Sequence, residues 1–196
     1  MLYRFLKFLF AIIFKIFYRI ELYNKDNIPN HNKNLIICGN HSSNLDPIIL
    51  TVYFDRPIYW MGKKELFENK ILGKILQQLG VFPVDRNHND LRAIKTSLKI
   101  LKDNKVLGIF PEGTRVKEIN YDEIKAGIAL IAQKTNSEIL PVYIDSDFKL
   151  FKKIKIYYRK PIKIDKEKKY NNTELMQISQ DIMRTIYGEE IKWKLY

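Results

Sequence analysis

Residues 35–47 of this chain read LIICGNHSSNLDP, and this stretch decides the class of fold. Its first part, 35–38, is a short apolar run, which is typical of a buried β-strand. Its last two residues, Asp46 and Pro47, form a helix-start pattern, with the aspartate as N-cap and the proline at the first helical position. A strand, a polar loop and a helix in direct succession predict the repeating unit of an α/β protein.

The rest of the chain repeats this alternation. Apolar, β-rich runs predict further strands, and helical patterns lie between and after them. The expected strands are 35–38, 58–61, 81–84, 106–110, 139–144 and 154–158, and the expected helices lie near 47–55, 64–79, 90–103, 122–135 and 172–187. The last strand is surrounded by lysines, which predicts a solvated edge strand. The alternation predicts an α/β layer fold.

Length and composition favour a single domain. The chain has 196 residues, 46% of them hydrophobic, so it can fill a core of its own. Its one cysteine, Cys38, excludes an intrachain disulfide and a cysteine-rich zinc site. Because Cys38 lies inside the first apolar run, we expect a small buried side chain there.

The net charge of +12 comes from two segments. Residues 1–20 contribute +4 and residues 149–169 contribute +8, while the remainder sums to zero. Such concentrations suit an anionic partner, which could be nucleic acid, an anionic membrane or a phosphate-bearing substrate. For residues 149–169, a solvated face and a contact with a membrane or a carrier protein are both open.

Residues 1–20 read MLYRFLKFLFAIIFKIFYRI and predict an amphipathic helix. On a helical wheel, the four basic residues fall within about 120° of one another, and apolar residues fill the other faces. The longest uncharged apolar run, Phe8 to Phe14, has seven residues, whereas a bilayer span needs about 20. We therefore expect a helix lying in the membrane interface, with docking on the core of the domain as the alternative. No small-residue cleavage site follows, so a signal peptide is not expected.

The polar loop of the first stretch carries a histidine and an aspartate five positions apart, His41 and Asp46. A neutral imidazole can take a proton from an attacking hydroxyl, and a carboxylate on its other nitrogen fixes the tautomer and stabilises the imidazolium. On this pattern alone, a helix cap at Asp46 and a loop histidine without a catalytic role stay open as the alternative.

Two later stretches carry candidate phosphate ligands. Residues 80–86, GVFPVDR, end a predicted strand in Arg86, and residues 110–115, FPEGTR, end in Arg115. Arginine suits bidentate phosphate binding. The alternatives are a salt bridge from the first arginine to its neighbour Asp85 and a tight turn in the second stretch.

In the second of these stretches, Gly113 frees the backbone to approach a ligand, and Glu112 could order the arginines or bind a substrate hydroxyl. A fourth apolar stretch, 139–144, could line the core or an acyl pocket. The chain has no Gly-x-Ser-x-Gly elbow, Walker loop or Gly-x-Gly-x-x-Gly, which disfavours a covalent serine mechanism.

Taken in order, residues 40–47, 80–86, 110–115 and 139–144 resemble the four motif blocks of the glycerolipid acyltransferase family, in particular its bacterial 1-acyl-glycerol-3-phosphate acyltransferases. The first block resembles the His-x4-Asp motif of that family. The resemblance covers about residues 20 to 165. One departure is Val116, where the third block of the family often continues with serine.

The resemblance implies a fold and a set of roles. The fold is a mixed, mostly parallel sheet flanked by helices, with residues 1–20 as a membrane-binding helix and 21–196 as the acyltransferase domain. His41 is implied as general base and Asp46 as its partner. The implied phosphate and acceptor site consists of Arg86, Glu112, Gly113, Thr114 and Arg115.

The implied reaction moves a fatty acyl group from acyl-CoA or acyl carrier protein to the sn-2 hydroxyl of 1-acyl-glycerol 3-phosphate, giving phosphatidic acid. The resemblance implies no metal and no cofactor beyond the acyl donor, and no nucleic acid. The expected partners are lysophosphatidic acid and an anionic membrane, on the cytoplasmic side of the inner membrane. The alternatives are an acyltransferase for another lysolipid or for glycerol 3-phosphate, and a basic membrane-binding protein without enzymatic activity.

Overall fold

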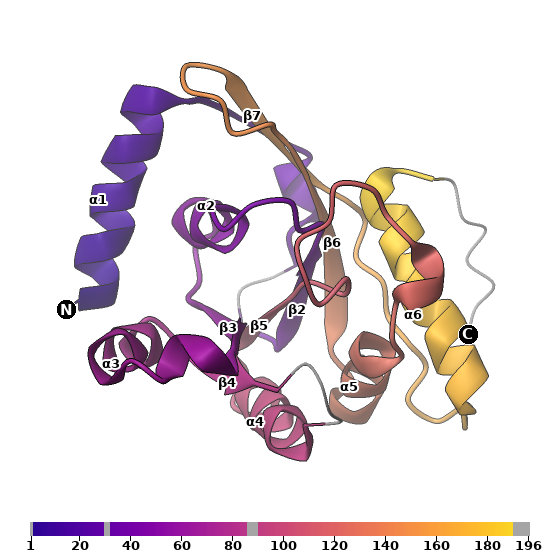
Figure 1. Cartoon of the computed structure of the whole chain (residues 1–196). Coiled ribbons are helices and arrows are strands. Elements are labelled where there is room, and N and C mark those ends of the chain that lie inside the picture. Colours follow the sequence, from indigo (N-terminus) through magenta and orange to yellow (C-terminus); the bar gives the residue numbers. More distant parts are fainter. Residues whose placement is uncertain (1, 30–31, 86–89, 190–196) are drawn as a thin grey trace.

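The computed structural model describes residues 2–29, 32–85 and 90–189, and within them seven strands form one sheet (Figure 1). The strand order is β1-β7-β6-β2-β5-β3-β4. β2 to β6 all run parallel, whereas β7 is antiparallel to β6 and parallel to β1. The strands are β1 Arg19–Tyr23, β2 Leu35–Gly39, β3 Ile58–Lys63, β4 Val81–Val84, β5 Val106–Ile109, β6 Glu138–Asp145 and β7 Lys153–Tyr158. The predicted mixed, mostly parallel sheet is therefore confirmed.

Helices cover both faces of this sheet (Figure 1). On one face, α1 and α2 pack on alternate residues of the strands, and on the other face α4, α5 and α6 do the same. The helices are α1 Leu2–Phe17, α2 Asp46–Tyr53, α3 Lys70–Gln78, α4 Leu91–Lys102, α5 Gly127–Thr135 and α6 Asn172–Tyr187, with short 3-10 turns at 25–27, 64–67 and 121–123. The central strand β2 is buried along its whole length, Cys38 included, as the sequence predicts.

The structure corrects three expectations about the elements. β1 was not among the predicted strands, and because it pairs with β7, the last predicted strand is not an edge strand. In β7 the exposed or half-buried lysines alternate with fully buried Ile154 and Ile156, so the lysines lie on one face only. In place of the single helix expected at 64–79, the structure has a 3-10 turn at 64–67 and then α3. Asn69 is the N-cap of α3. The helix expected at 122–135 begins only at Gly127.

The N-terminal helix α1 is apolar on two sides. Phe14 is buried in the core against α2, whereas Phe5, Phe8, Ile12 and Ile16 are exposed. The helix therefore docks on the domain and still presents an apolar row to its surroundings. None of the helices in the part of the chain that the structure describes combines the length and apolar character needed to cross a bilayer.

Candidate active site

The loop that follows β2 lies at the carboxyl end of the parallel strands, where α/β proteins usually place reactive groups. Asn40 holds this loop in place. Its buried side chain donates from Nδ2 to the Ile144 carbonyl (3.1 Å), and its Oδ1 accepts from the Ile144 amide (2.8 Å). The end of β2 is thereby fixed to the end of its neighbour β6.

His41 and Asp46 are in direct contact. His41 Nδ1 lies 3.0 Å from Asp46 Oδ2, and the same oxygen accepts from the Ser42 and Ser43 amides, each at 2.7 Å. Asp46 is fully buried. Its carboxylate turns back into the loop and does not cap α2, whose N-cap residue is Leu45. The sequence prediction that Asp46 caps this helix is therefore wrong, because the carboxylate contacts the loop before the helix, through Oδ2.

This contact sets the proton arrangement of the imidazole. An ionised carboxylate only accepts hydrogen bonds, so the proton between the two groups belongs to Nδ1 of His41. In a neutral imidazole with its proton on Nδ1, the lone pair is on Nε2, which has no hydrogen-bond partner among the described residues. Such an imidazole can accept a proton from a hydroxyl placed against it.

The imidazole of His41 is the first of three stacked aromatic rings. The Phe110 ring lies 4.2 Å from the imidazole at 14°, and the Trp60 indole lies 4.9 Å from Phe110 at 8°. The indole is itself held by a hydrogen bond from Nε1 to Thr51 Oγ1 (2.9 Å). Because each ring contacts the next, the position of the imidazole depends on the packing between β3 and β5.

Glu112 binds the backbone of His41. The His41 amide donates to Glu112 Oε2 (2.7 Å), and the Tyr187 hydroxyl donates to Oε1 (3.3 Å). Burial, and to a smaller extent the nearby charge of Asp46, raise the pKa of Glu112 to about 7, although these two hydrogen bonds oppose the rise. Further along the loop, the Val116 amide donates to the His41 carbonyl (2.9 Å). Residues 110–116 thus bind both the backbone amide and the backbone carbonyl of His41.

Of the remaining predicted site residues, three lie on the loop 110–116, and the fourth is outside the residues that the structure describes. Gly113 has φ +67°, a left-handed conformation that suits glycine. Thr114 and Arg115 are exposed, and Arg115 makes no hydrogen bond or ion pair with any described residue. Arg86, the other expected phosphate ligand, lies outside the described residues. The structure therefore brings Glu112 into contact with His41. That Arg86 and Arg115 bind one phosphate together stays a prediction.

Three residues around this site, Trp60, Phe110 and Tyr187, were not assigned to it from the sequence. Phe110 had a weak signal, because it directly follows a strand that ends at the reactive edge of the sheet. Tyr187 had none, because it comes from the last turn of α6 and reaches Glu112 only through the tertiary fold.

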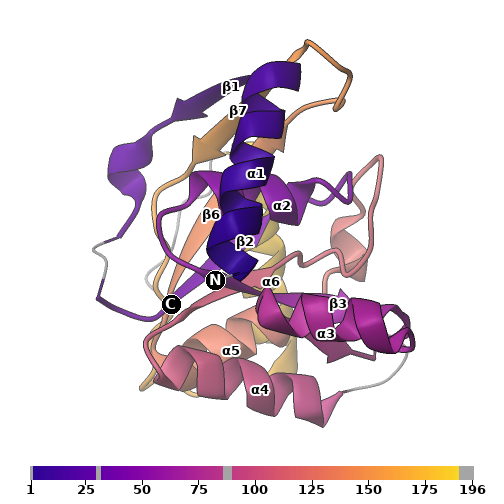
Figure 2. The same ribbon diagram turned by 90° about the vertical axis from the view of Figure 1, so that its left-hand side faces the viewer.

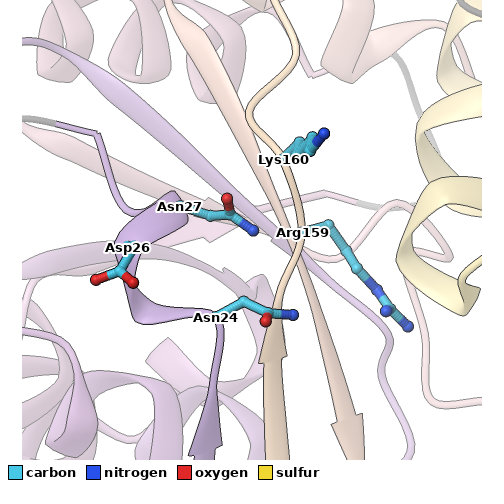
Figure 3. Close-up of a pocket in the computed structure, with 5 residues that line it drawn as sticks. All are labelled: Asn24, Asp26, Asn27, Arg159 and Lys160. Carbon is cyan, nitrogen blue, oxygen red and sulfur yellow. The ribbon is translucent and has the colours of Figure 1, made fainter.

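A cavity of about 400 Å³ lies elsewhere, beside the ends of β1 and β7 (Figure 3). Asn24, Asp26, Asn27, Arg159 and Lys160 line it, and none of the predicted site residues does. Figure 3 shows Asp26 pointing away from Arg159. Asn27 Nδ2 and Arg159 Nε already donate to backbone carbonyls of the fold. Among the described residues, no group of three or more His, Cys, Asp or Glu side chains could hold a metal ion.

Comparison with known proteins places this site in a family. A family model described as Acyltransferase matches residues 19–145, which include both His41 and Glu112. A curated 1-acyl-sn-glycerol-3-phosphate acyltransferase of Bacillus subtilis (strain 168) is 39% identical over 141 residues, 70% of this chain and 69% of that protein. A relative with the same name from Streptococcus pneumoniae (strain ATCC BAA-255 / R6) is 31% identical over 168 residues, 82% of this chain and 62% of that protein.

The fold has a solved counterpart. The crystal structure of the 1-acyl-sn-glycerophosphate (LPA) acyltransferase PlsC from Thermotoga maritima matches 97% of this chain and 80% of that chain, with a TM-score of 0.69. At 20% sequence identity this match supports the fold alone. The family model and the two curated relatives lead to one conclusion: the chain belongs to the Acyltransferase family.

Proposed function

We propose that this chain transfers a fatty acyl group from a thioester donor, acyl-CoA or acyl carrier protein, to the sn-2 hydroxyl of 1-acyl-glycerol 3-phosphate. The product is phosphatidic acid. The names of the curated bacterial relatives support the choice of acceptor. The single observation that carries the chemistry is the 3.0 Å contact between His41 Nδ1 and the buried carboxylate of Asp46.

In the proposed reaction, His41 is the general base. Nε2 takes the proton of the sn-2 hydroxyl as its oxygen bonds to the thioester carbonyl carbon. Collapse of the tetrahedral adduct breaks the carbon–sulfur bond, and the imidazolium returns the proton to the leaving thiolate. A thioester carbonyl is already activated, so no covalent acyl-enzyme is required.

Asp46 is the proposed orienting partner. Its carboxylate keeps the proton on Nδ1, so that Nε2 faces the hydroxyl as an acceptor, and its charge stabilises the imidazolium that forms. The Ser42 and Ser43 amides that bind the same oxygen hold the carboxylate in place. This arrangement needs no rearrangement when the proton moves.

We propose that the acceptor phosphate binds beside this pair. Arg115 is exposed on the loop whose Glu112 and Val116 are bonded to His41, and it makes no ion pair with a described residue that would compete with a phosphate. Arg86 is the proposed second phosphate ligand. Glu112, Gly113 and Thr114 are proposed to shape the same site.

We further propose that the enzyme works at the cytoplasmic surface of the inner membrane as a peripheral or monotopic protein. The exposed apolar row of α1 supports this, because it faces away from the domain. Two exposed basic residues of the same helix, Arg4 and Lys15, make no ion pair with described residues and suit anionic headgroups.

The first test removes the base. We expect His41→Ala to lower the rate of acyl transfer to 1-acyl-glycerol 3-phosphate by about 10²–10⁴-fold or more, with an unchanged circular dichroism spectrum. The matched control is His31→Ala, which makes the same chemical change outside every motif quoted above. Substantial activity in the first variant, or an equal loss in both, contradicts the base assignment. If the unaltered protein transfers no acyl group from any of the thioester donors to any of the acceptors, the proposal that it is an enzyme is wrong.

A second test addresses the phosphate. We expect Arg115→Ala to lower kcat/KM for 1-acyl-glycerol 3-phosphate by about 10–100-fold, since a hydrogen bond to a charged group contributes about 1.5–3 kcal/mol. A phosphate-free monoacylglycerol should lose much less. Glycerol 3-phosphate and other lysolipids complete the panel of acceptors. If all acceptors slow equally, the phosphate role of Arg115 is wrong.

A further inference from the structure

The loop between β6 and β7 presents two large apolar side chains at its tip. Leu150 is 59% exposed and Phe151 is 74% exposed, a degree of exposure that Ile71 alone equals among the large hydrophobic residues that the structure describes. An exposed phenylalanine beside an exposed leucine is an unfavourable arrangement in water. A covering partner would remove that cost.

The loop is held in this conformation by its own bonds. Phe148 has φ +52° and Phe151 has φ +63°, both in the left-handed region that side chains other than glycine rarely adopt. The Phe148 amide donates to Ser146 Oγ (2.8 Å), the Lys149 amide to Asp147 Oδ1 (3.1 Å), and the Lys152 amide to the Lys149 carbonyl (3.2 Å). Phe148 packs on the core while Phe151 is kept outside. The exposed tip is therefore a structured feature.

The tip is joined to the end of α1. The Phe151 amide donates to the Phe17 carbonyl (2.7 Å), the Arg19 amide donates to the Lys152 carbonyl (3.2 Å), and the Phe17 and Phe151 rings lie 6.1 Å apart. In both Figure 1 and Figure 2 the loop lies at the C-terminal end of α1. The loop tip thus contacts the last residue of α1, next to Ile16, which is the last member of the exposed apolar row.

Basic residues border this junction. Lys15 and Lys152 make no ion pair with any described residue. The acids nearby are already paired with lysines: Asp145 with Lys155 (3.3 Å), Asp147 with Lys149 (3.1 Å) and Glu21 with Lys153 (2.9 Å). The surroundings of the apolar tip therefore carry excess positive charge, which complements an anionic lipid surface.

The loop also connects directly to the site. It begins just after β6, and the backbone of Ile144 near the end of that strand is bonded to Asn40, the neighbour of His41. Only a few residues of chain therefore separate the loop tip from Ile144, which is bonded to the loop that carries His41. If the tip is held at a surface, the His41 loop is held at a defined distance from that surface.

From these observations we propose that the β6–β7 loop is a second membrane-contact element, with Leu150 and Phe151 inserted at the headgroup boundary of an anionic bilayer beside α1. A single helix lying in an interface can roll about its axis, whereas a second anchor beyond its end fixes the orientation of the domain. The proposal rests on the proposed function, because a lysolipid acceptor that resides in a bilayer requires the site to stand at a defined orientation to the surface.

The test is binding of the full chain to vesicles of phosphatidylglycerol and phosphatidylcholine, measured by sedimentation. We expect the double variant Leu150→Ser, Phe151→Ser to bind about tenfold or more weakly, since it removes two side chains that bury apolar surface. The matched control is Leu91→Ser, which alters a side chain that is 67% exposed at the start of α4. The control should bind like the unaltered protein, and all three should melt at similar temperatures.

Activity completes the test. The loop variant should lose turnover of a long-chain acceptor in vesicles and keep turnover of a short-chain, monomeric 1-acyl-glycerol 3-phosphate. Unchanged vesicle binding overturns the proposal, even if acyl transfer is normal. If the loop variant binds vesicles normally and loses turnover only with acyl carrier protein as donor, the loop is a protein-docking surface. That result also overturns the proposal. Absence of acyl transfer by the unaltered protein would defeat the proposed function, while the vesicle result would still decide the role of the loop.

Discussion

At the scale of single residues, Glu112 is the side chain with the most unusual surroundings. It is partly buried, it binds the backbone of His41, and it lies close enough to Asp46 to be affected by its charge. Its pKa of about 7 means that it is partly protonated near neutral pH. When it ionises, a negative charge is added near the Asp46 carboxyl group that contacts the imidazole.

This pKa has a consequence for stability. The folded pKa lies above the ordinary 4.5, so the folded chain keeps a proton that the unfolded chain releases between pH 4.5 and about 7. The contribution to stability is therefore complete below pH 4.5 and is lost as the pH rises through about 7. Its size is at most about 3 kcal/mol at 1.36 kcal/mol per pKa unit.

Replacing Glu112 by glutamine removes the titration. We expect the free energy of unfolding of the unaltered protein to fall relative to that of Glu112→Gln between pH 5 and pH 8, by up to about 3 kcal/mol. Urea unfolding of both proteins at several pH values measures this difference, and other titrating groups cancel in it. A difference that stays constant over this range would show that Glu112 titrates normally.

At the scale of elements, the absence of a side chain on β5 decides where the aromatic stack lies. Gly108 pairs with Trp60 of β3, and a Cβ at Gly108 would lie 2.3 Å from the indole Cε3. The indole can lie across β5 only because that position is glycine. Through Phe110, this placement reaches the imidazole of His41.

We therefore expect Gly108→Ala to displace the indole, lower the free energy of unfolding by about 1–3 kcal/mol and reduce acyl transfer. Gly127→Ala is the matched control, because no atom lies within 4 Å of a Cβ built there. The control should stay within about 0.5 kcal/mol of the unaltered protein. Urea unfolding and the acyl-transfer assay measure both effects. Equal behaviour of the two variants would mean that the indole can move at no cost.

At the scale of the whole molecule, α1 serves the core and the surface at once. Phe14 is 2% exposed and packs with residues of α2 and the central strands, while Phe8 on the same helix is 66% exposed. The predicted division into a helix at 1–20 and a domain at 21–196 thus separates segments that share one core.

The two phenylalanines should respond in opposite ways to substitution. We expect Phe14→Ala to lower the free energy of unfolding by about 3–5 kcal/mol, since it leaves a cavity between α1 and α2. Phe8→Ser should change it by less than about 0.5 kcal/mol and should weaken binding to anionic vesicles. Urea unfolding and vesicle sedimentation check the pair. A destabilised Phe8→Ser variant, or a fully stable Phe14→Ala variant, would contradict this division of the helix.

The sequence by itself determined what depends on neighbouring residues. Apolar runs separated by helical patterns predicted six of the seven described strands and the α/β class, because strand and helix periodicities are local. It also identified His41 and Asp46, which are five positions apart, so that a single turn into α2 brings them together. The order of the motif blocks determined the family resemblance in the same way.

Only the tertiary structure decided what depends on residues far apart in the chain. β1 has a short, mixed sequence, and it is a strand because β7 offers it a partner. Glu112 meets His41 across 71 positions and Tyr187 across 75, because β2, β5 and α6 end at one edge of the molecule. Periodicity in a sequence records which face of an element is buried, whereas the order of strands in the sheet decides which distant side chains share a site.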